Sequence, residues 1–457
     1  MVPAVIVGGG VSGLSAAYYL SRAGIPATLV EERPRLGGVV STSTVDGCVI
    51  EGGPDSFLAA KPAAMELIRE VGLEGEVIGS NDSRRVTYIR KGGRLIPLPD
   101  GLMMMAPTRI WPVAMSPLLG WGTKLRMGLE YFRRPRPEAP GRSVAEFVAA
   151  HYGQEAVDYL AEPLLSGVYG GDPAKLSVES VLPRFVEMER KHGSLTKGAL
   201  AARKGQGSGG GALFQTLKGG LQQLTGRVAE RARPEWIRGR AERVERGDDV
   251  WRVRVGGGWI EARHLVLAGP AYMAAELMRD AAPRLRELLA GIEYSSSMTV
   301  ALGYDREKLG HPQNGFGFLV PSRERRRLVA CTWVGTKFSH RVADNRALLR
   351  CFLGGAGDAA ILGESDDAVV ALVRGEIREI MGVSAEPLFA RVTRWPRSMA
   401  QYLVGHAARL REIEARVKEL PSLYLAGNGY RGIGIPDCIQ LGREAASRIA
   451  ASSQQPA

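Results

Sequence analysis

The chain opens with the run Val5-Ile6-Val7-Gly8-Gly9-Gly10-Val11-Ser12-Gly13-Leu14, and Glu31 follows eighteen residues after Gly13. An apolar, β-prone segment leads into a glycine turn, and an amphipathic stretch leads out of it. The pattern predicts strand 4–7, helix 12–23 and strand 27–31, which together form a βαβ unit. Such a unit, with an acidic residue at the end of its second strand, is typical of dinucleotide-binding proteins.

Each residue type in this turn has a physical task in binding a pyrophosphate. Gly8 permits a tight turn, Gly10 lets a phosphate approach the backbone, and Gly13 lets the helix pack closely against the strand. The first helical N–H groups, at Val11 and Ser12, offer hydrogen bonds and a partial positive charge to the phosphate. The acidic residue after the second strand can accept hydrogen bonds from a ribose hydroxyl.

Length and composition indicate a globular protein of two or three domains. The chain has 457 residues, of which 45% are hydrophobic and 24% charged, and no run of 18 or more uncharged apolar residues predicts a membrane-spanning helix. The first strand starts so close to Met1 that we expect no signal peptide. Four scattered cysteines without CxxC spacing predict reduced cytosolic thiols, and hence a cytoplasmic protein. They are Cys48, Cys331, Cys351 and Cys438.

The chain is basic, with 60 Lys and Arg residues against 48 Asp and Glu, a net charge of +12. Such an excess could serve a nucleic acid, an anionic membrane or an acidic substrate. No RNP, zinc-finger or helix-turn-helix signature accompanies the basic clusters, so we do not expect nucleic acid as a partner. The six histidines lack metal-ligand spacing, which predicts no bound metal, and only His406 lies in a motif of interest.

Several motifs resemble those of amine-oxidase-type flavoproteins. Arg35, Gly37 and Gly38 follow the first acidic residue at the spacing at which this superfamily contacts the FAD phosphates and the flavin ring. The segment 214–221 is similar to the one that runs along the flavin, and Val244 matches a valine whose backbone holds the adenine. The segment 427–439 resembles the loop and helix start that close over the flavin, where helix N–H groups stabilise negative charge. This resemblance implies FAD as the cofactor.

Apolar periodicity and turn residues predict further elements: a hairpin at 84–99, mainly helical structure over 100–200, and helices at 217–228, at 367–381 and from about 438. The glycine-rich run 204–211 predicts a flexible linker.

The distribution of these motifs predicts the domain organisation. A strand–glycine–helix pattern stands at both ends of the chain, so both ends are expected to build one domain, with the middle inserted into it. We predict an α/β fold with a discontinuous Rossmann-type FAD-binding domain, an inserted α+β substrate domain and a helical subdomain. The predicted segments are 1–80, 206–280 and 413–457 for the FAD-binding domain, 81–100 and 281–412 for the substrate domain, and 101–205 for the helical subdomain.

Four further segments resemble the oxygen-dependent porphyrinogen oxidases of haem biosynthesis, in the same order and at similar spacing. They are 51–58, 162–172, 315–321 and 401–406. Within that family, three segments are most similar to the coproporphyrinogen III oxidase branch, namely 331–333, 393–395 and 434–438. Protoporphyrinogen IX oxidases share most of the other motifs and are the alternative. More distant alternatives are another member of the superfamily, either a carotenoid desaturase or a flavin amine oxidase with Trp395 and Tyr430 as an aromatic cage, and a non-enzymatic FAD-bearing scaffold for a membrane or nucleic acid.

The resemblance implies a six-electron oxidation of coproporphyrinogen III to coproporphyrin III, with O2 as acceptor and H2O2 as by-product. The flavin carries this chemistry, so no side chain is expected to be catalytic. The expected substrate-binding residues are Lys61, which would meet a propionate, and Gly167, Phe316, Gly317 and Leu319. The expected FAD-binding residues are Gly8, Gly10, Val11, Ser12, Gly13, Glu31, Glu32, Arg35, Gly37, Gly38, Gly53, Pro54, Asp55, Ser56, Val244, Gly427, Gly434, Ile435 and Pro436.

The resemblance also implies partners. Besides the porphyrinogen and O2, a ferrochelatase-type enzyme is a candidate to receive the product. The helical block 101–131 holds enough Met and Trp residues for a weak peripheral contact with the cytoplasmic membrane. Arg109, Lys124 and Arg126 interrupt this block, so we expect a largely soluble enzyme.

Overall fold

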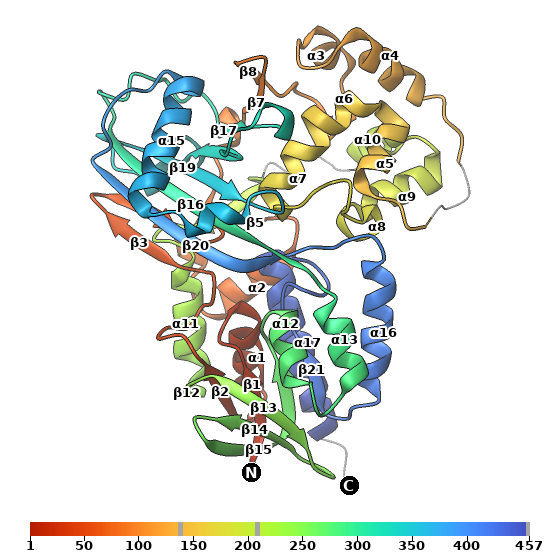
Figure 1. Cartoon of the computed structure of the whole chain (residues 1–457), viewed down its shortest axis with the longest axis vertical. Coiled ribbons are helices and arrows are strands. Elements are labelled where there is room, and N and C mark those ends of the chain that lie inside the picture. Colours follow the sequence, from red (N-terminus) through yellow and green to blue (C-terminus); the bar gives the residue numbers. More distant parts are fainter. Residues whose placement is uncertain (136–139, 206–210, 454–457) are drawn as a thin grey trace.

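The computed structural model describes residues 1–135, 140–205 and 211–453. Figure 1 shows three parts: a lower body that contains both chain ends, an upper sheet covered by helix α15 (Asp366–Met381), and a group of helices beside that sheet. Red, green and blue segments mix in the lower body, so stretches that are far apart in the sequence build it together (Figure 1). The predicted mixed α/β class is confirmed.

A sheet with parallel strands forms the centre of the lower body. Its order is β12-β2-β1-β15-β14-β13, and β21 also pairs with β15. Strand β1 pairs in parallel with both β2 and β15, as a βαβ unit requires. The observed bounds agree with the predicted strands at 4–7 and 27–31. The strands are β1 (Val2–Val7), β2 (Ala27–Glu31), β12 (Glu235–Arg238), β13 (Ala241–Arg246), β14 (Trp251–Val255), β15 (Gly258–Leu267) and β21 (Leu423–Leu425).

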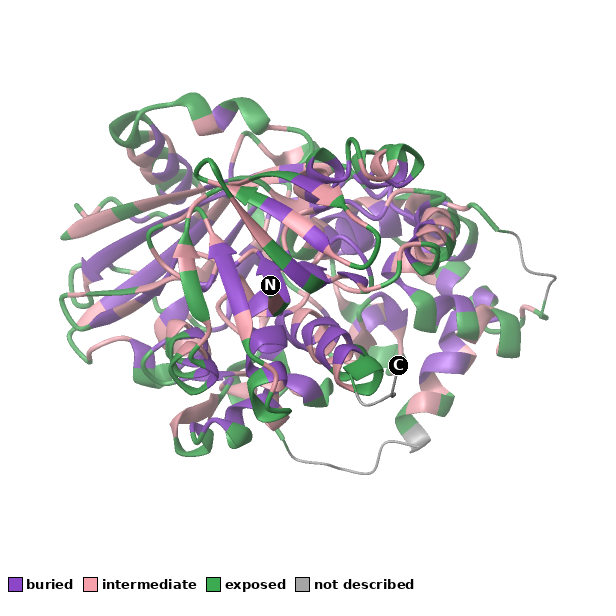
Figure 2. Ribbon diagram, turned by 90° about the horizontal axis from the view of Figure 1, so that it is seen from below, coloured by how far each residue is buried: buried purple, intermediate pink, exposed green. Residues whose placement is uncertain are grey.

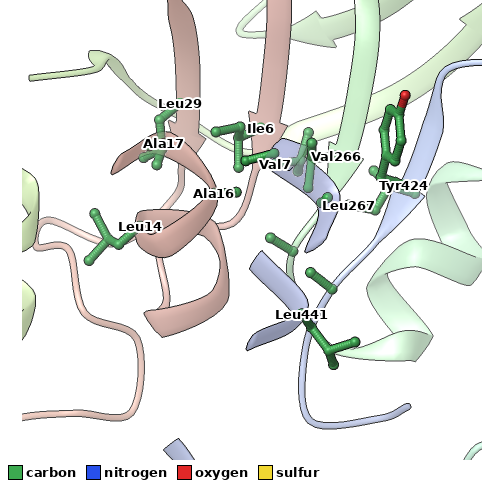
Figure 3. Packing of buried hydrophobic residues seen from close by; sticks show 14 of the residues in the cluster. Ile6, Val7, Leu14, Ala16, Ala17, Leu29, Val266, Leu267, Tyr424 and Leu441 are labelled. Atoms are coloured by element: carbon green, nitrogen blue, oxygen red, sulfur yellow. The ribbon is translucent and has the colours of Figure 1, made fainter. Parts of the chain in front are cut away.

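The first and last helices of the chain pack against each other beside this sheet. Gly442 of α17 (Ile435–Ser453) lies so close to α1 (Val11–Arg22) that a Cβ there would be 2.3 Å from the Ser12 carbonyl oxygen. Apolar side chains from both ends of the chain, such as Leu14 and Leu441, share one core (Figure 3). The other helices of the lower body are α2 (Pro62–Glu70), α11 (Gln222–Ala232), α12 (Ala271–Leu277), α13 (Pro283–Ala290) and α16 (His406–Lys418).

A second seven-stranded sheet lies above, in the order β20-β16-β19-β18-β17-β7-β8. Its neighbours are antiparallel except for the parallel pair β17 and β7. The predicted hairpin at 84–99 and helix at 367–381 are confirmed as β7–β8 and α15. The strands are β7 (Thr87–Lys91), β8 (Arg94–Pro97), β16 (Tyr294–Asp305), β17 (Gly317–Leu319), β18 (Ala330–Trp333), β19 (Arg346–Gly354) and β20 (Phe389–Ala400).

Short elements lie between and around the two sheets. The strands are β3 (Thr42–Val45), β4 (Cys48–Glu51), β5 (Phe57–Leu58), β6 (Val77–Gly79) and β11 (Phe214–Leu217), and the helices are η1 (Glu74–Glu76), η2 (Asp82–Arg84), η4 (Ser322–Glu324), α14 (Val334–Lys337), η5 (Ser339–Arg341) and η6 (Ala359–Gly363). Viewed from below, buried residues fill the strands and the inward helix faces, and exposed residues occupy the periphery (Figure 2).

The third part is mainly helical, as predicted for residues 100–200, with one small hairpin of β9 (Leu102–Met103) and β10 (Ala106–Pro107). Its helices are α3 (Ile110–Met115), α4 (Trp121–Glu130), α5 (Val144–Tyr152), α6 (Gln154–Ala156), η3 (Val157–Ala161), α7 (Glu162–Tyr169), α8 (Val178–Val181), α9 (Pro183–His192) and α10 (Leu195–Gly205). In the part of the chain that the structure describes, no helix combines the length and the apolarity needed to cross a membrane.

A buried carboxylate joins these helices. Glu130 faces His151 Nδ1 at 2.8 Å, and its oxygens also accept hydrogen bonds from the Ser194 hydroxyl at 2.8 Å and from the Leu195 N–H at 2.7 Å. Burial alone would raise the pKa of Glu130, but the hydrogen bonds, of which that from His151 is the strongest, lower it to about 2. The ionised carboxylate therefore stabilises the packing of α4 against α5 and α10.

This arrangement predicts an acid-sensitive contribution to stability. A depressed pKa in the folded state stabilises the protein above the unfolded pKa of 4.5, and the contribution disappears as the pH falls toward about 2. We expect Glu130→Gln to cost about 3 kcal/mol of unfolding free energy at pH 7, and less at pH 4 and below. Urea unfolding of both proteins across this range measures the difference. A difference that does not shrink with acid would contradict the role given to Glu130.

Two predicted helix starts were wrong, and the predicted linker at 204–211 lies mostly outside the described residues. The helix expected at 217–228 begins only at Gln222, because Phe214–Leu217 pairs as a strand with β5 and β6. The helix expected from about 438 begins at Ile435. Pro436 is tolerated there, since a proline in the first helical turn lacks only an N–H that would have no intrahelical partner.

Candidate functional site

The glycine turn after β1 forms an open cradle at the start of α1. Gly8 adopts φ +110°, and a Cβ on Gly13 would lie 1.9 Å from the Gly8 carbonyl oxygen, so both positions require glycine. Gly10 is different, because the atom nearest to its missing Cβ is the Cα of Gly38, at 4.0 Å. No side chain caps α1, and its first turn holds no acidic residue. With Val11 and buried Ser12, this helix start fits a pyrophosphate.

Glu31 stands at the end of β2 in a fixed orientation. Its carboxylate accepts hydrogen bonds from the Gly9 N–H at 2.7 Å and from the Arg33 N–H at 2.9 Å. These two bonds leave lone pairs on both oxygens, which fits a ribose hydroxyl. Glu32, the neighbouring predicted ligand, is exposed.

Arg35 shapes the loop that follows β2. Its guanidinium donates to the carbonyl oxygens of Val40 and Gly38, both at 2.8 Å. Gly37 donates its N–H to the Gly9 carbonyl at 2.8 Å, and Gly38 has φ +60° beside Gly10. The structure thus brings the two predicted glycine motifs together, while the Arg35 side chain is committed to the loop itself.

The segment Gly53-Pro54-Asp55-Ser56 lies between the two sheets. A Cβ on Gly53 would be 1.9 Å from the Val39 carbonyl oxygen, which places this segment against the loop after β2. The Asp55 carboxylate is 3.0 Å from Lys337 Nζ and accepts a 2.6 Å hydrogen bond from the Ser56 hydroxyl. Burial opposes ionisation of Asp55, but Lys337 and Arg350 outweigh it and hold the pKa of Asp55 below its usual range.

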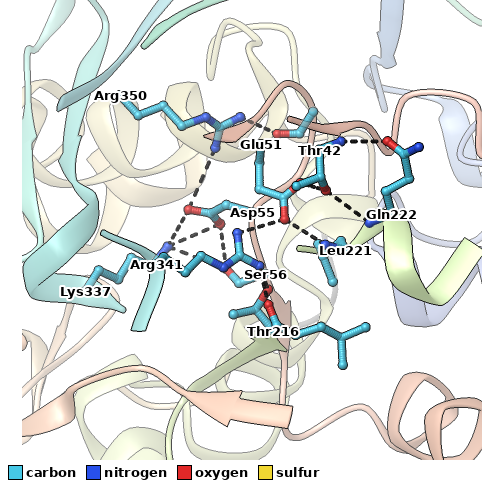
Figure 4. Close-up of polar contacts among 12 residues, drawn as sticks. Thr42, Glu51, Asp55, Ser56, Thr216, Leu221, Gln222, Lys337, Arg341 and Arg350 are labelled. Carbon is cyan, nitrogen blue, oxygen red and sulfur yellow. Dashed lines mark hydrogen bonds and ion pairs between the residues drawn. The ribbon is translucent and has the colours of Figure 1, made fainter. Parts of the chain in front are cut away.

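Sequence reasoning missed three basic residues around this segment, namely Lys337, Arg341 and Arg350. Arg341 donates to the Glu51 carboxylate at 2.7 Å, and both side chains are almost completely buried (Figure 4). Lys337 and Arg350 pair with Asp55 in the same way. All three pairs join residues about 290 positions apart, so no local spacing in the sequence predicts them.

The C-terminal loop 427–434 is held by the motif around His406. The Tyr402 hydroxyl donates to the Asn428 carbonyl at 2.8 Å and accepts from the Gly432 N–H at 2.9 Å. His406 stacks on Tyr402 with ring centroids 4.1 Å apart, and burial lowers the pKa of His406. His406 therefore supports this loop as a neutral ring.

The remaining predicted cofactor residues also lie in the lower body. Gly427 has φ +139° and approaches the backbone of Gly269, while Gly434, Ile435 and Pro436 form the start of α17. Val244 is buried on β13, where it pairs with Val253.

Gln215 supplies a further observation for the segment 214–221. Among residues 1–135, 140–205 and 211–453, its Oε1 atom is buried without a hydrogen-bond partner. An unpaired buried acceptor is costly, so it fits the N–H or hydroxyl groups of a bound flavin nucleotide.

Two of the predicted substrate residues face each other. Gly167 is exposed on α7, and its missing Cβ would lie 3.7 Å from Leu319 Cδ2 on β17. Phe316, the residue directly before β17, is buried. Gly317 has φ +136°, and a Cβ there would be 1.9 Å from the Cys331 carbonyl oxygen. The glycine at 317 is therefore required by the neighbouring strand and is not by itself evidence for a ligand.

Lys61 lies directly before α2. Its Nζ atom is 2.7 Å from both carboxylate oxygens of Asp437 in the first turn of α17. The side chain is 46% exposed, so its ammonium group is accessible, but a propionate would have to compete with Asp437.

Comparison with known proteins agrees with this geometry. The profile of the flavin containing amine oxidoreductase family matches residues 11–450. The coproporphyrinogen III oxidase of Bacillus subtilis is 34% identical, with 97% of each chain covered. The chloroplastic protoporphyrinogen oxidase of Nicotiana tabacum is 27% identical, with 97% of this chain and 85% of that protein covered.

Solved structures show the same architecture. A crystal structure from Exiguobacterium superposes with a TM-score of 0.88 at 32% identity and covers 98% of this chain and 99% of its own. Cyclohexylamine oxidase from Brevibacterium oxydans, at 20% identity, shares the fold with a TM-score of 0.73 and covers 99% of this chain and 100% of its own. The match over nearly the whole chain, together with the glycine cradle and the oriented Glu31, shows that this chain belongs to the flavin-containing amine oxidoreductase family.

Proposed function

We propose that this protein oxidises coproporphyrinogen III to coproporphyrin III, with FAD as its cofactor and O2 as the electron acceptor, releasing H2O2. The observation that carries the proposal is the near-complete coverage, in both directions, of relatives named coproporphyrinogen III oxidase, from Bacillus subtilis at 34% identity and from Mycobacterium tuberculosis at 33%. The reaction belongs to haem biosynthesis, in which a porphyrin passes on to metal insertion.

The chain's own residues bind and orient the reactants. Gly10 at the α1 start would hold the pyrophosphate of FAD, Glu31 would hold the ribose, and Gly53 with the start of α17 would contact the isoalloxazine ring. Bound FAD supplies the two-electron chemistry, in which a hydride leaves the porphyrinogen in each of three rounds. Gly167 and Leu319, which face each other, would contact the macrocycle. The roles of the other expected ligands remain predictions.

The number of substrate carboxylates separates the two porphyrinogens, since coproporphyrinogen III has four propionates and protoporphyrinogen IX has two. The purified protein, with FAD, is supplied with each porphyrinogen under air, and porphyrin fluorescence is followed. We expect faster turnover of coproporphyrinogen III. Equal or faster turnover of protoporphyrinogen IX would transfer the assignment to the second branch, with which the Nicotiana relative is consistent.

The surroundings of Trp395 and Tyr430, the two candidates for an aromatic cage, argue against an amine oxidase. Trp395 donates its Nε1–H to the Gly52 carbonyl at 2.7 Å, and the guanidinium of Arg33 covers the ring at 5.6 Å. Tyr430 is buried. A cage for an amine needs two open, parallel aromatic faces, which this pair does not offer.

The helical part supports a weak contact with the cytoplasmic membrane. Large apolar side chains on α3, on α4 and just after α4 are 61–82% exposed, an unusual density for a surface that meets only water. They are Ile110, Trp111, Met115, Trp121, Leu125, Leu129 and Phe132. Arg109, Lys124 and Arg126 lie on the same two helices or next to them and would meet anionic headgroups.

This contact predicts a measurable loss in a double variant. We expect the wild-type protein to co-sediment weakly with vesicles rich in phosphatidylglycerol, and Trp111→Ser with Trp121→Ser to reduce binding on the order of tenfold. Trp236→Ser, on β12 in the lower body, is the matched control, because this tryptophan is also partly exposed. Equal binding by the double variant and the control would refute the contact.

A cytoplasmic location at the membrane surface also suits the product. Coproporphyrin combines an apolar ring with anionic propionates, and a ferrochelatase-type enzyme that inserts a metal would be its acceptor. Transfer of porphyrin between the two purified proteins, followed by its fluorescence, tests this partner.

A further inference from the structure

The segment from Glu51 to Ser56 is held by side chains of the upper sheet. The Gly52 carbonyl accepts two hydrogen bonds, from the Thr299 hydroxyl on β16 at 3.0 Å and from Trp395 Nε1 on β20 at 2.7 Å. Arg350 on β19 donates to the next carbonyl, that of Gly53. Side chains from three adjacent strands thus take the place of a backbone partner for this irregular segment.

Charged side chains from the same part of the chain fix the acidic residues of the segment. Arg341 pairs with Glu51, while Lys337 and Arg350 lie 3.0 Å and 3.7 Å from the Asp55 carboxylate (Figure 4). The Lys337 ammonium also stands over the Phe214 ring at 5.0 Å. Within the described residues, no third carboxylate pairs with these cations, so three positive charges face two negative ones.

The hydrogen bonds to the backbone and the ion pairs with the carboxylates hold the same short stretch of chain. Gly53 O and the Asp55 carboxylate share one guanidinium, and Asp55 is joined to Ser56 by its own hydrogen bond. Loss of a single cation would therefore leave the half-buried Asp55 carboxylate partly unpaired and release the backbone on either side of Pro54. The segment contributes four of the residues expected to bind FAD, at 53–56.

We propose that Lys337 and Arg350 are positioning residues that hold the Gly53–Ser56 backbone in the shape that receives the flavin, and that their excess positive charge favours the reduced flavin. This inference rests on the proposed function, because it takes FAD to lie against this segment. It adds two residues that act through Asp55 and the Gly53 carbonyl: Arg350 lies in β19 of the upper sheet, and Lys337 ends helix α14, which directly follows β18 of the same sheet. The position of the upper sheet relative to this segment therefore sets the shape of the cofactor site.

The two residues can be separated by charge and by geometry. Lys337→Met removes a charge, whereas Arg350→Lys keeps the charge but loses the planar fork that reaches Gly53 O and Asp55 together. Lys337→Arg restores the charge next to Asp55. Arg346→Leu is the matched control, because Arg346 lies on β19 together with Arg350. Arg346 pairs at 2.6 Å with Asp46, which lies in the turn between β3 and β4 and not in the segment 51–56.

The experiment measures the FAD dissociation constant by flavin fluorescence and the midpoint potential of the loaded proteins, with urea unfolding of the FAD-free forms for comparison. We expect Lys337→Met to weaken FAD binding on the order of tenfold and to lower the potential, and Lys337→Arg to restore both. Arg350→Lys should weaken binding by a similar factor with little change in potential, and Arg346→Leu should change neither.

Unchanged FAD affinity and potential in Lys337→Met, or equal changes in Arg346→Leu, would overturn the inference while leaving the proposed function intact. If Lys337→Met does not fold, the double variant Lys337→Met with Asp55→Asn removes both charges, and wild-type FAD affinity in that variant would equally overturn it. Failure of the wild-type protein itself to bind FAD would instead refute the proposed function.

Discussion

Replacement of Arg341 by methionine is expected to lower the free energy of unfolding by about 3–5 kcal/mol, since it leaves a buried carboxylate without its cation. Arg341 is 1% exposed, and besides Glu51 it donates to the Thr216 hydroxyl at 2.6 Å and to the Leu217 carbonyl at 2.8 Å. One side chain of η5 thus joins β4 and β11, which are distant in the sequence. Urea unfolding at neutral pH measures the loss.

Two further variants make this result specific. Arg346→Leu removes an arginine of the same region from its pair with Asp46, and we expect the unfolding free energy to stay nearly unchanged. Glu51→Gln in the Arg341→Met background removes the orphaned charge and should recover part of the lost stability. If Arg341→Met were no less stable than Arg346→Leu, the contacts of Arg341 with β4 and β11 would not stabilise the fold.

Replacement of Gly10 by valine is expected to abolish flavin retention without unfolding the protein. Gly10 has φ −75° and ψ −173°, a conformation that valine adopts readily, and its Cβ would meet only the Gly38 Cα, at 4.0 Å. The added side chain would therefore occupy the space above the α1 start. We expect FAD affinity to fall on the order of 100-fold, equivalent to losing two or three hydrogen bonds to the phosphates.

The neighbouring glycine gives the opposite pattern. Gly13→Ala would place a methyl group 1.9 Å from the Gly8 carbonyl oxygen and should destabilise the fold itself. Gly226→Val, on an exposed face of α11 with no atom within 4 Å, is the control for the effect of valine and should keep wild-type FAD affinity. FAD bound normally by Gly10→Val would show that the phosphates do not lie at this helix.

The sequence predicts well where an element depends on local pattern. The strand, turn and helix around Gly8 to Gly13 follow from apolar periodicity and glycine spacing, and so does the hairpin at 84–99. The helix start at 217 failed because Phe214–Leu217 is recruited as a strand by β5 and β6, which are more than a hundred residues away. Tertiary pairing here overrides helix propensity.

The residues of the candidate site likewise fall into two groups, those that local sequence predicts and those that it does not. Glu31 and the glycines were predictable because their tasks are local, whereas Lys337, Arg341 and Arg350 matter only through partners that the fold brings to them. The composition of the block 101–131 showed that it is rich in apolar residues. The 77% exposure of Trp111 could not be predicted, because an amphipathic pattern does not show whether its apolar face packs against the protein core or contacts a membrane.

The most direct test of the account is the anaerobic titration of the FAD-loaded protein with coproporphyrinogen III, followed by visible absorption. We predict that the absorption of the oxidised flavin bleaches as coproporphyrin appears, with about three flavins reduced per porphyrin formed, since each accepts two of six electrons. Admission of air should restore the colour. An absorption spectrum that stays unchanged when coproporphyrinogen is added, while an amine bleaches it, would contradict the account.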